Sequence, residues 1–146
     1  MDVTSLFRIS ASGLNAERTR LEAINSNIAN ANATRTPEGG PYRRRVPVFQ
    51  SVNFQDAFPD LEGKGESAPS LATVSVKDIT LDRSPLPIVY DPGHPDADAS
   101  GYVTMPNVNP IKEMVDLLQA SRSYENNLAA IENTKDLTTA ALDIGR

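Results

Sequence analysis

The sequence predicts a mainly α fold with a small β insertion, in which long terminal helices form an antiparallel, coiled-coil-like pair. Apolar residues recur every seven positions in residues 1–34 and again in residues 107–146, a spacing at which helical residues share a face. Between these stretches, residues 35–106 hold ten of the eleven prolines, six of the eight glycines and six of the eight aromatic residues. That composition excludes long helices there and favours short strands and turns.

The N-terminal helix is predicted from a row of apolar residues spaced by seven. The row consists of Phe7, Leu14, Leu21 and Ile28. A companion row contains Val3, Ile24 and Ala31, with polar Ser10 and Glu17 as its exceptions. Four asparagines then follow one another closely in residues 25–32. Because asparagine competes for backbone hydrogen bonds, this helix should end near residues 30–34.

The middle region, residues 35–106, is predicted to contain short strands. Valines alternate around Pro47, which restricts that strand to an edge or a bulge. In residues 72–81 the alternation changes phase, which predicts a bulge at Lys77–Asp78. The residues after Asp82 suggest a turn into Leu86, Ile88 and Tyr90, and therefore a hairpin between residues 72–81 and 86–90. Residues 56–71 are expected to form a solvated, mobile loop.

The C-terminal helix is predicted to run from Pro110 to Asp143, about 50 Å at 1.5 Å per residue. Asn109 suits the N-cap, and Glu113 lies in the first turn, where the helix dipole favours it. One row of its heptads reads Leu117, Tyr124, Ile131 and Thr138, and the other reads Met114, Ser121, Leu128, Lys135 and Leu142. A helix of this length needs a long partner, and an apolar seam shared with the N-terminal helix supplies one.

Composition excludes several classes of protein. The chain has no cysteine, so no disulfide framework exists. No apolar run reaches the length of a membrane-spanning helix, and the N-terminus lacks the continuous apolar core of a cleaved signal peptide. A net charge of −5 argues against a general nucleic-acid binder.

Two charged clusters contain residue types that are common in chemical sites. Asp91, His94, Asp96 and Asp98 offer one imidazole among carboxylates, the residue types used for metal binding or acid–base catalysis. The neighbouring prolines and glycine favour a structural turn, in which aspartates bond to local backbone N–H groups. The run Arg43–Arg45 suggests phosphate binding, but alternation along a strand points Arg44 away from its neighbours and favours an interfacial or solvated role.

Motifs at both ends of the chain resemble those of the bacterial flagellar rod and hook proteins. The N-terminal motifs are Ala11-Ser12-Gly13-Leu14 and Asn27-Ile28-Ala29-Asn30. The C-terminal ones are Glu113-Met114-Val115, Ala120, Arg122, Tyr124-Glu125 and Lys135. In the middle, Gly40-Pro41-Tyr42-Arg43-Arg44, the run from Asp91 to Ala97, Gly101-Tyr102-Val103 and Pro106-Asn107-Val108-Asn109 resemble the proximal-rod members of that family.

The resemblance implies a non-enzymatic subunit of the flagellar proximal rod, the helical drive shaft that transmits motor torque. It implies that the terminal helices, in residues 1–34 and 107–146, form the inner coiled-coil domain and that residues 35–106 lie outside it. Implied partners are copies of the same chain, other rod proteins, the hook–basal-body complex and the membrane-ring base. The implied location is the periplasm-spanning rod, reached through the flagellar type III export apparatus without a cleaved signal peptide.

The residues expected to form the assembly interface come from the heptad rows. They are Phe7, Leu14, Leu21, Ile28, Met114, Leu117, Tyr124, Leu128, Ile131 and Leu142. No catalytic residue, cofactor, metal, nucleic acid or small-molecule substrate is expected. Two other interpretations remain open at this level: a secreted coiled-coil module that forms a closed oligomer, and, less favoured, an enzyme built around His94.

Overall fold

A computed structural model describes residues 3–58 and 71–144 and has the mainly α fold with a small β part that the sequence predicts. The two long helices are α1, Val3–Ala29, and α3, Pro110–Ile144. Between them lie β1 (Arg45–Asn53), the short helix α2 (Phe54–Ala57), β2 (Ala72–Leu81), β3 (Ile88–Tyr90) and β4 (Tyr102–Thr104). The loop expected in residues 56–71 falls largely outside the described residues.

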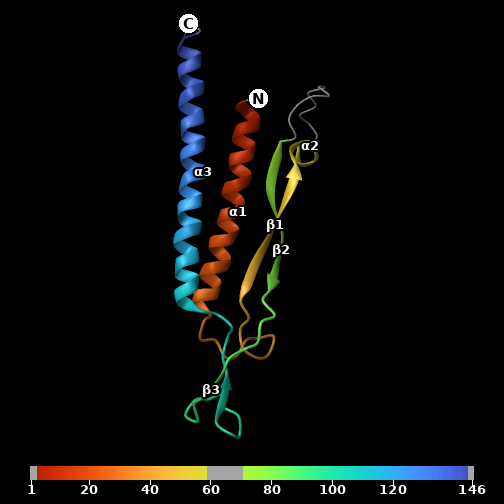
Figure 1. Cartoon of the computed structure of the whole chain (residues 1–146), viewed down its shortest axis with the longest axis vertical. Coiled ribbons are helices and arrows are strands. Elements are labelled where there is room, and N and C mark those ends of the chain that lie inside the picture. Colours follow the sequence, from red (N-terminus) through yellow and green to blue (C-terminus); the bar gives the residue numbers. More distant parts are fainter. Residues whose placement is uncertain (1–2, 59–70, 145–146) are drawn as a thin grey trace.

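The long elements form three layers, with α1 in the middle (Figure 1). α3 packs along one side of α1, and the two-stranded ribbon β1–β2 packs along another. The two helices run in opposite directions, so the predicted antiparallel pair is confirmed. The small β3–β4 ribbon lies beyond the end where α1 stops and α3 begins.

Both helix boundaries near this junction follow from asparagine side chains. Asn109 Oδ1 accepts hydrogen bonds from the backbone N–H groups of Ile111 and Lys112, at 3.0 and 3.3 Å, so the predicted N-cap of α3 is present. At the end of α1, Asn30 Nδ2 donates to the carbonyl oxygen of Ser26 at 2.9 Å. This side chain binds a carbonyl in the last turn of the helix, and the chain turns away after Ala29.

The β1–β2 ribbon contains the predicted bulge. β1 and β2 pair antiparallel, with Val48 opposite Asp78 and Phe49 opposite Val76. Lys77 is therefore the extra residue on β2, within the predicted Lys77–Asp78 step. Pro47 pairs with Ile79 in a two-stranded sheet, where each strand is an edge, as its missing N–H requires.

The predicted hairpin between residues 72–81 and 86–90 is wrong. β2 pairs with β1, and β3 pairs with β4, a strand that the alternation pattern did not reveal. Pro85 and Pro87 have no N–H to donate to a ladder. In addition, Asn107 Nδ2 donates to the Asp82 carbonyl oxygen at 3.1 Å and to Ser84 Oγ at 2.8 Å, which leads this segment away from β2.

Asp82 also stabilises the segment between β2 and β3. Its carboxylate oxygen accepts the Ser84 backbone N–H at 2.8 Å, and this bond, with the Ser84 hydroxyl, lowers the pKa of the Asp82 carboxyl. A lowered pKa in the folded state means that the contribution to stability is present above the ordinary aspartate pKa and is lost as the pH falls through the folded-state value.

The β3–β4 ribbon depends on a glycine at its turn. Tyr90 and Tyr102 pack edge to face with ring centroids 5.2 Å apart. Gly101 has φ +83°, and a Cβ there would lie 2.8 Å from Tyr90 Cε2. Glycine is therefore required both by the backbone conformation and by the close approach of the tyrosine ring.

A buried polar network joins α1, the start of β1 and α3. Asn27 is 1% exposed, and its amide makes all four of the hydrogen bonds that it can form. Nδ2 donates to the Arg45 carbonyl oxygen and to Glu113 Oε2, both at 3.0 Å. Oδ1 accepts the Tyr42 hydroxyl at 2.9 Å and the Arg45 N–H at 2.8 Å.

Glu113 connects this network to a cation. Its side chain is fully buried, and Arg44 Nε donates to Oε1 at 2.6 Å. The Arg44 guanidinium also reaches Asp116 Oδ2 at 3.3 Å, while the Arg44 backbone N–H donates to Asn107 Oδ1 at 2.9 Å. The carboxylate of Glu113 is thus bonded on both oxygens, which offsets the cost of removing it from water.

We predict that Glu113→Gln destabilises the protein by about 2–4 kcal/mol, because it removes the charge beside Arg44 and leaves one acceptor atom where the carboxylate has two. The amide oxygen cannot accept from both Arg44 Nε and Asn27 Nδ2, and the amide NH₂ group faces one of these donors. Urea unfolding followed by far-ultraviolet circular dichroism measures the change. The matched control is Glu125→Gln, the same substitution at an exposed position of α3, which should change stability by less than about 0.5 kcal/mol. Equal effects of the two substitutions would contradict a structural role for the network.

Candidate assembly interface

The face of α3 that packs against α1 is a heptad face with many small and polar residues. Its two rows are Glu113, Ala120, Asn127 and Thr134, and Leu117, Tyr124, Ile131 and Thr138. All are buried or half-buried. The spacing alternates between four and three residues along the whole helix, which keeps the face turned toward one antiparallel partner.

The second predicted seam row is not the one that packs against α1. Met114, Leu128 and Leu142 are 53%, 41% and 68% exposed. The prediction chose apolar residues, but the neighbouring row contains the buried Glu113 and Thr134, whose polar atoms are bonded inside the protein. Hydrogen bonding has therefore turned α3 by about one residue relative to a purely apolar seam, and it leaves leucine and methionine side chains outside.

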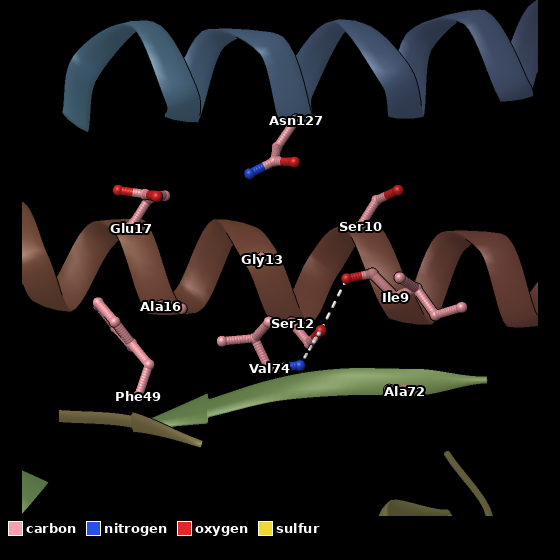
Figure 2. A pocket seen from close by; sticks show the side chains of 10 residues that line it. All are labelled: Ile9, Ser10, Ser12, Gly13, Ala16, Glu17, Phe49, Ala72, Val74 and Asn127. Carbon is pink, nitrogen blue, oxygen red and sulfur yellow. Dashed lines mark hydrogen bonds between the residues drawn. The ribbon is translucent and has the colours of Figure 1, made fainter. Parts of the chain in front are cut away.

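Gly13 allows α1 to approach α3 closely. A Cβ at Gly13 would lie 3.1 Å from Asn127 Nδ2, and Figure 2 shows the Asn127 amide directed at this turn of α1. On the opposite side of α1, Ser12 Oγ donates to the Ile9 carbonyl oxygen at 2.7 Å and accepts the Val74 N–H of β2 at 3.3 Å. A pocket of about 280 Å³ lies between the three layers here.

The apolar row of α1 lies on a third side of that helix. The β ribbon covers the side with Ile9, Ser12 and Ala16, and α3 covers the side with Gly13 and Asn27. Residues at seven-residue spacing from Leu14 lie on the remaining side next to α3, and Phe7, Leu14, Leu21 and Ile28 are all half-buried.

The matching side of α3 follows from Asp116, which lines a pocket with Pro47 and Phe49 of the ribbon. Ser121 and Leu128 therefore lie on the side of α3 away from the ribbon, next to the half-buried Tyr124. Together, the two helices present a partly exposed apolar surface opposite the ribbon. We call this surface the open flank and define it by Phe7, Leu14, Leu21, Ile28, Leu117, Tyr124, Leu128 and Ile131.

α3 also extends past the start of α1. Asn27 bonds to Glu113, and Gly13 lies against Asn127. In both pairs the residue numbers add to 140, so Val3 lies opposite Leu137. The residues of α3 after Leu137 therefore have no counterpart in the described part of α1, and Figure 1 shows α3 continuing beyond it. Leu142 in this overhang is exposed.

The structure brings all ten predicted interface residues onto the helix pair, but it divides them. Eight of them define the open flank, Met114 lies at the border of that surface, and Leu142 lies in the overhang. Sequence reasoning missed the structural roles of Asn27, Arg44 and Glu113. The sequence did contain a signal for the inward position of Glu113, because this residue lies in heptad register with Leu117 and Ala120.

The cluster around His94 forms the predicted turn. Asp91 Oδ1 accepts the Gly93 N–H at 3.2 Å, His94 Nδ1 accepts the Asp96 N–H at 3.1 Å, and Asp98 Oδ1 accepts the Ser100 N–H at 2.8 Å. These atoms are bonded to the local backbone. Within residues 3–58 and 71–144, no group of three or more histidine, aspartate or glutamate side chains is placed to hold a metal ion.

Arg44 points away from its neighbours in the basic run, as predicted, although β1 begins only at Arg45 and strand alternation is not the cause. Arg43 Nη1 donates to the Asp82 and Ser84 carbonyl oxygens at 3.3 and 3.4 Å, and the Arg45 guanidinium lies 5.8 Å from the centre of the Tyr42 ring. Arg44 points instead to α3. Each guanidinium thus has a partner inside the chain, and the run has an interfacial role within the fold.

Two family models match the chain, and both lie on the elements that build the helix pair. Residues 7–35 match the flagella basal body rod protein model, which covers most of α1. Residues 99–144 match the model of the flagellar basal body rod FlgEFG protein C-terminal region, which covers β4 and α3. Among the described residues, no helix is long and apolar enough to cross a membrane.

Several curated proteins are similar to this chain over almost its full length. The flagellar basal-body rod protein FlgC of Borreliella burgdorferi is 42% identical, over 99% of this chain and 98% of the relative. The protein of the same name from Bacillus subtilis is 43% identical, over 94% and 95%. That of Escherichia coli O6:H1 is 39% identical, over 100% of both chains.

We predict that His94→Ala lowers the free energy of unfolding by no more than about 1 kcal/mol, because the side chain supplies one exposed turn hydrogen bond. Thermal unfolding measures this change. Isothermal titration with Zn²⁺ should give no difference between the native chain and the variant. Zinc binding that His94→Ala abolishes would contradict the turn interpretation.

We also predict that backbone amides in residues 138–144 exchange with solvent much faster than those of residues 113–131 in the isolated protein, since the overhang has no partner helix in the described part of the chain. Hydrogen–deuterium exchange read by mass spectrometry measures both segments in one sample. Equal protection along the whole of α3 would show that the isolated chain covers the overhang.

Proposed function

Since this chain belongs to the FlgC family of flagellar basal-body rod proteins, we propose that it is a structural subunit of the proximal rod, where it assembles with copies of itself and with other rod proteins. One structural observation carries the proposal: within the described chain, the helix pair leaves the open flank partly exposed and the end of α3 uncovered. A chain with such surfaces gains stability when neighbouring helices exclude water from them.

The arrangement suits a helical shaft. A contact between two different surfaces, repeated with a rotation that does not close, produces an open helical assembly rather than a ring. In such an assembly, torque passes through staggered helix contacts, which distribute shear over a large packed area. We therefore assign the helices in residues 1–34 and 107–146 to a coiled-coil-like inner domain and residues 35–106 to an outer position.

The proposed interface contains the ten predicted residues and divides them into an exposed group and a half-buried group. Leu128, Met114 and Leu142 are exposed and contact neighbours directly. The half-buried residues of the open flank serve both the helix pair and the neighbour, because each has one side on the partner helix and one side free. This division predicts that substitutions in the two groups differ in their effect on the isolated chain.

The proposal includes a location and a route. The chain belongs in the flagellar basal body, next to other rod proteins, the hook–basal-body complex and the membrane-ring base. Export through the flagellar type III apparatus, without removal of a signal peptide, fits a chain that has no disulfide to form before passage. The role is structural and not enzymatic, in agreement with the local hydrogen bonding of the His94 turn.

We predict that Leu128→Asp abolishes motility while the isolated chain keeps its stability within about 1 kcal/mol, because Leu128 is 41% exposed in the monomer and desolvated only in the assembly. Ile131→Asp should abolish motility and also destabilise the monomer, since Ile131 is half-buried against α1. Soft-agar swimming, electron microscopy of basal bodies and urea unfolding measure the three effects.

The control is Glu132→Asp, which keeps the charge at an exposed position beside Ile131 and should leave rods normal. Secretion of each variant into the medium of a strain that lacks later rod components separates failed assembly from failed export. Ordinary rods built from Leu128→Asp and Ile131→Asp subunits would show that this helix is not an assembly face.

A further inference from the structure

The first two turns of α3 carry an apolar stripe on the side away from α1. It consists of Ile111, Met114, Val115 and Leu118, which are 75%, 53%, 59% and 63% exposed. We call this set the outer stripe. Its members occupy positions i, i+3, i+4 and i+7, so they form one continuous strip along the helix. Four large apolar side chains with this exposure contribute little to the core of the isolated chain, and an exposed apolar patch of this kind indicates an interaction surface.

The spacing of the outer stripe indicates the shape of its partner. Anchors at i, i+3, i+4 and i+7 are those of an amphipathic helix that lies in an apolar groove. A groove of this kind is formed by two helices side by side. The partner is therefore expected to present a helix pair with an uncovered apolar side.

This chain has such a helix pair of its own, and we call the middle of its open flank the groove. At the middle of the open flank, Leu14 and Leu21 of α1 lie beside Tyr124 and Leu128 of α3. The register of the pair places Leu14 opposite Asn126 and Leu21 opposite Gln119, so Tyr124 lies between the levels of the two leucines and Leu128 lies just beyond Leu14. The groove and the outer stripe are different parts of the surface, and Met114 lies where the outer stripe adjoins the open flank.

Charges beside the two surfaces are complementary. Lys112 and Arg122 flank the outer stripe, and Glu125 and Glu132 border the groove on α3; all four are exposed. No ion pair within residues 3–58 and 71–144 involves any of them. Opposite charges at the rim of an apolar contact steer association and select its register.

We propose that the outer stripe of one copy docks into the open flank of a second copy. The inference rests on the proposed rod function and adds the identity of the contact and of the partner. Because the stripe and the groove are different surfaces, the contact is heterologous, and each copy keeps one free stripe or one free groove for the next. Lys112 and Arg122 of one copy then approach Glu125 and Glu132 of the other.

Two single variants test the contact in mixture. Leu118→Asp breaks the stripe and keeps the groove, while Leu128→Asp breaks the groove and keeps the stripe. Neither variant should associate alone at a concentration where the native chain does, but an equimolar mixture should give one-to-one pairs that do not grow. Sedimentation velocity measures the species. Asn126→Asp, an exposed position on another side of α3, is the matched control and should associate like the native chain.

The absence of cysteine makes the geometry measurable by cross-linking. Val115→Cys is placed in the Leu128→Asp chain and Ser121→Cys in the Leu118→Asp chain, and a short bismaleimide is added. A cross-linked dimer is expected in the mixture and not in either variant alone. As an electrostatic test, Lys112→Glu should weaken association about two- to fivefold, and Glu125→Lys in the other copy should restore it.

The outcomes separate this inference from the rod function. Motile cells carrying Leu118→Asp, with normal basal bodies, would overturn the inference and leave the rod function in place. Loss of rods in Leu118→Asp cells, with no mixed dimer in solution, would also overturn it, because the occupant of the stripe would then be a different rod protein. Pairing of Leu118→Asp with itself at native strength would show that copies associate through other surfaces.

Discussion

The buried amide of Asn27 is the interaction on which the arrangement of this molecule depends. Its four hydrogen bonds join three segments that are far apart in sequence: the end of α1, the residues that begin β1, and the first turn of α3. An amide bonded in this way has no alternative position that satisfies all of its donors and acceptors. The register of the helix pair and the start of the ribbon are therefore specified at the same point.

Glu113 and Arg44 extend this specification by a charge pair that is mostly shielded from water. Buried ionic groups contribute little net stability compared with well-packed apolar residues, but breaking one of them is costly. Their effect here is to determine which side of α3 faces α1. With Glu113 held inward, Asn127 and Thr134 follow at seven-residue intervals, and the apolar neighbours of these residues turn outward.

This orientation couples the fold to assembly. The intramolecular face of α3 holds Ala120, Asn127 and Thr134, while large apolar residues such as Leu118 and Leu137 are exposed. Much of the apolar area of the helix is therefore available to neighbouring subunits. In the proposed assembly, binding to a neighbour would stabilise the folded chain by mass action.

The sequence by itself determined the two long helices and the bulged ribbon strands, because their causes are local, but it did not reveal β4. Heptad spacing predicts both long helices, Asn109 predicts the start of α3, and the change of phase at Lys77 predicts the bulge. Motifs along the chain also predicted the family before any comparison. Only the tertiary structure decided which strands pair and which side of α3 is inside. Those choices depend on hydrogen bonds between distant residues, such as Asn27 with Glu113 and Asn107 with Ser84. Because the groups involved are polar, a pattern of apolar residues does not predict these bonds.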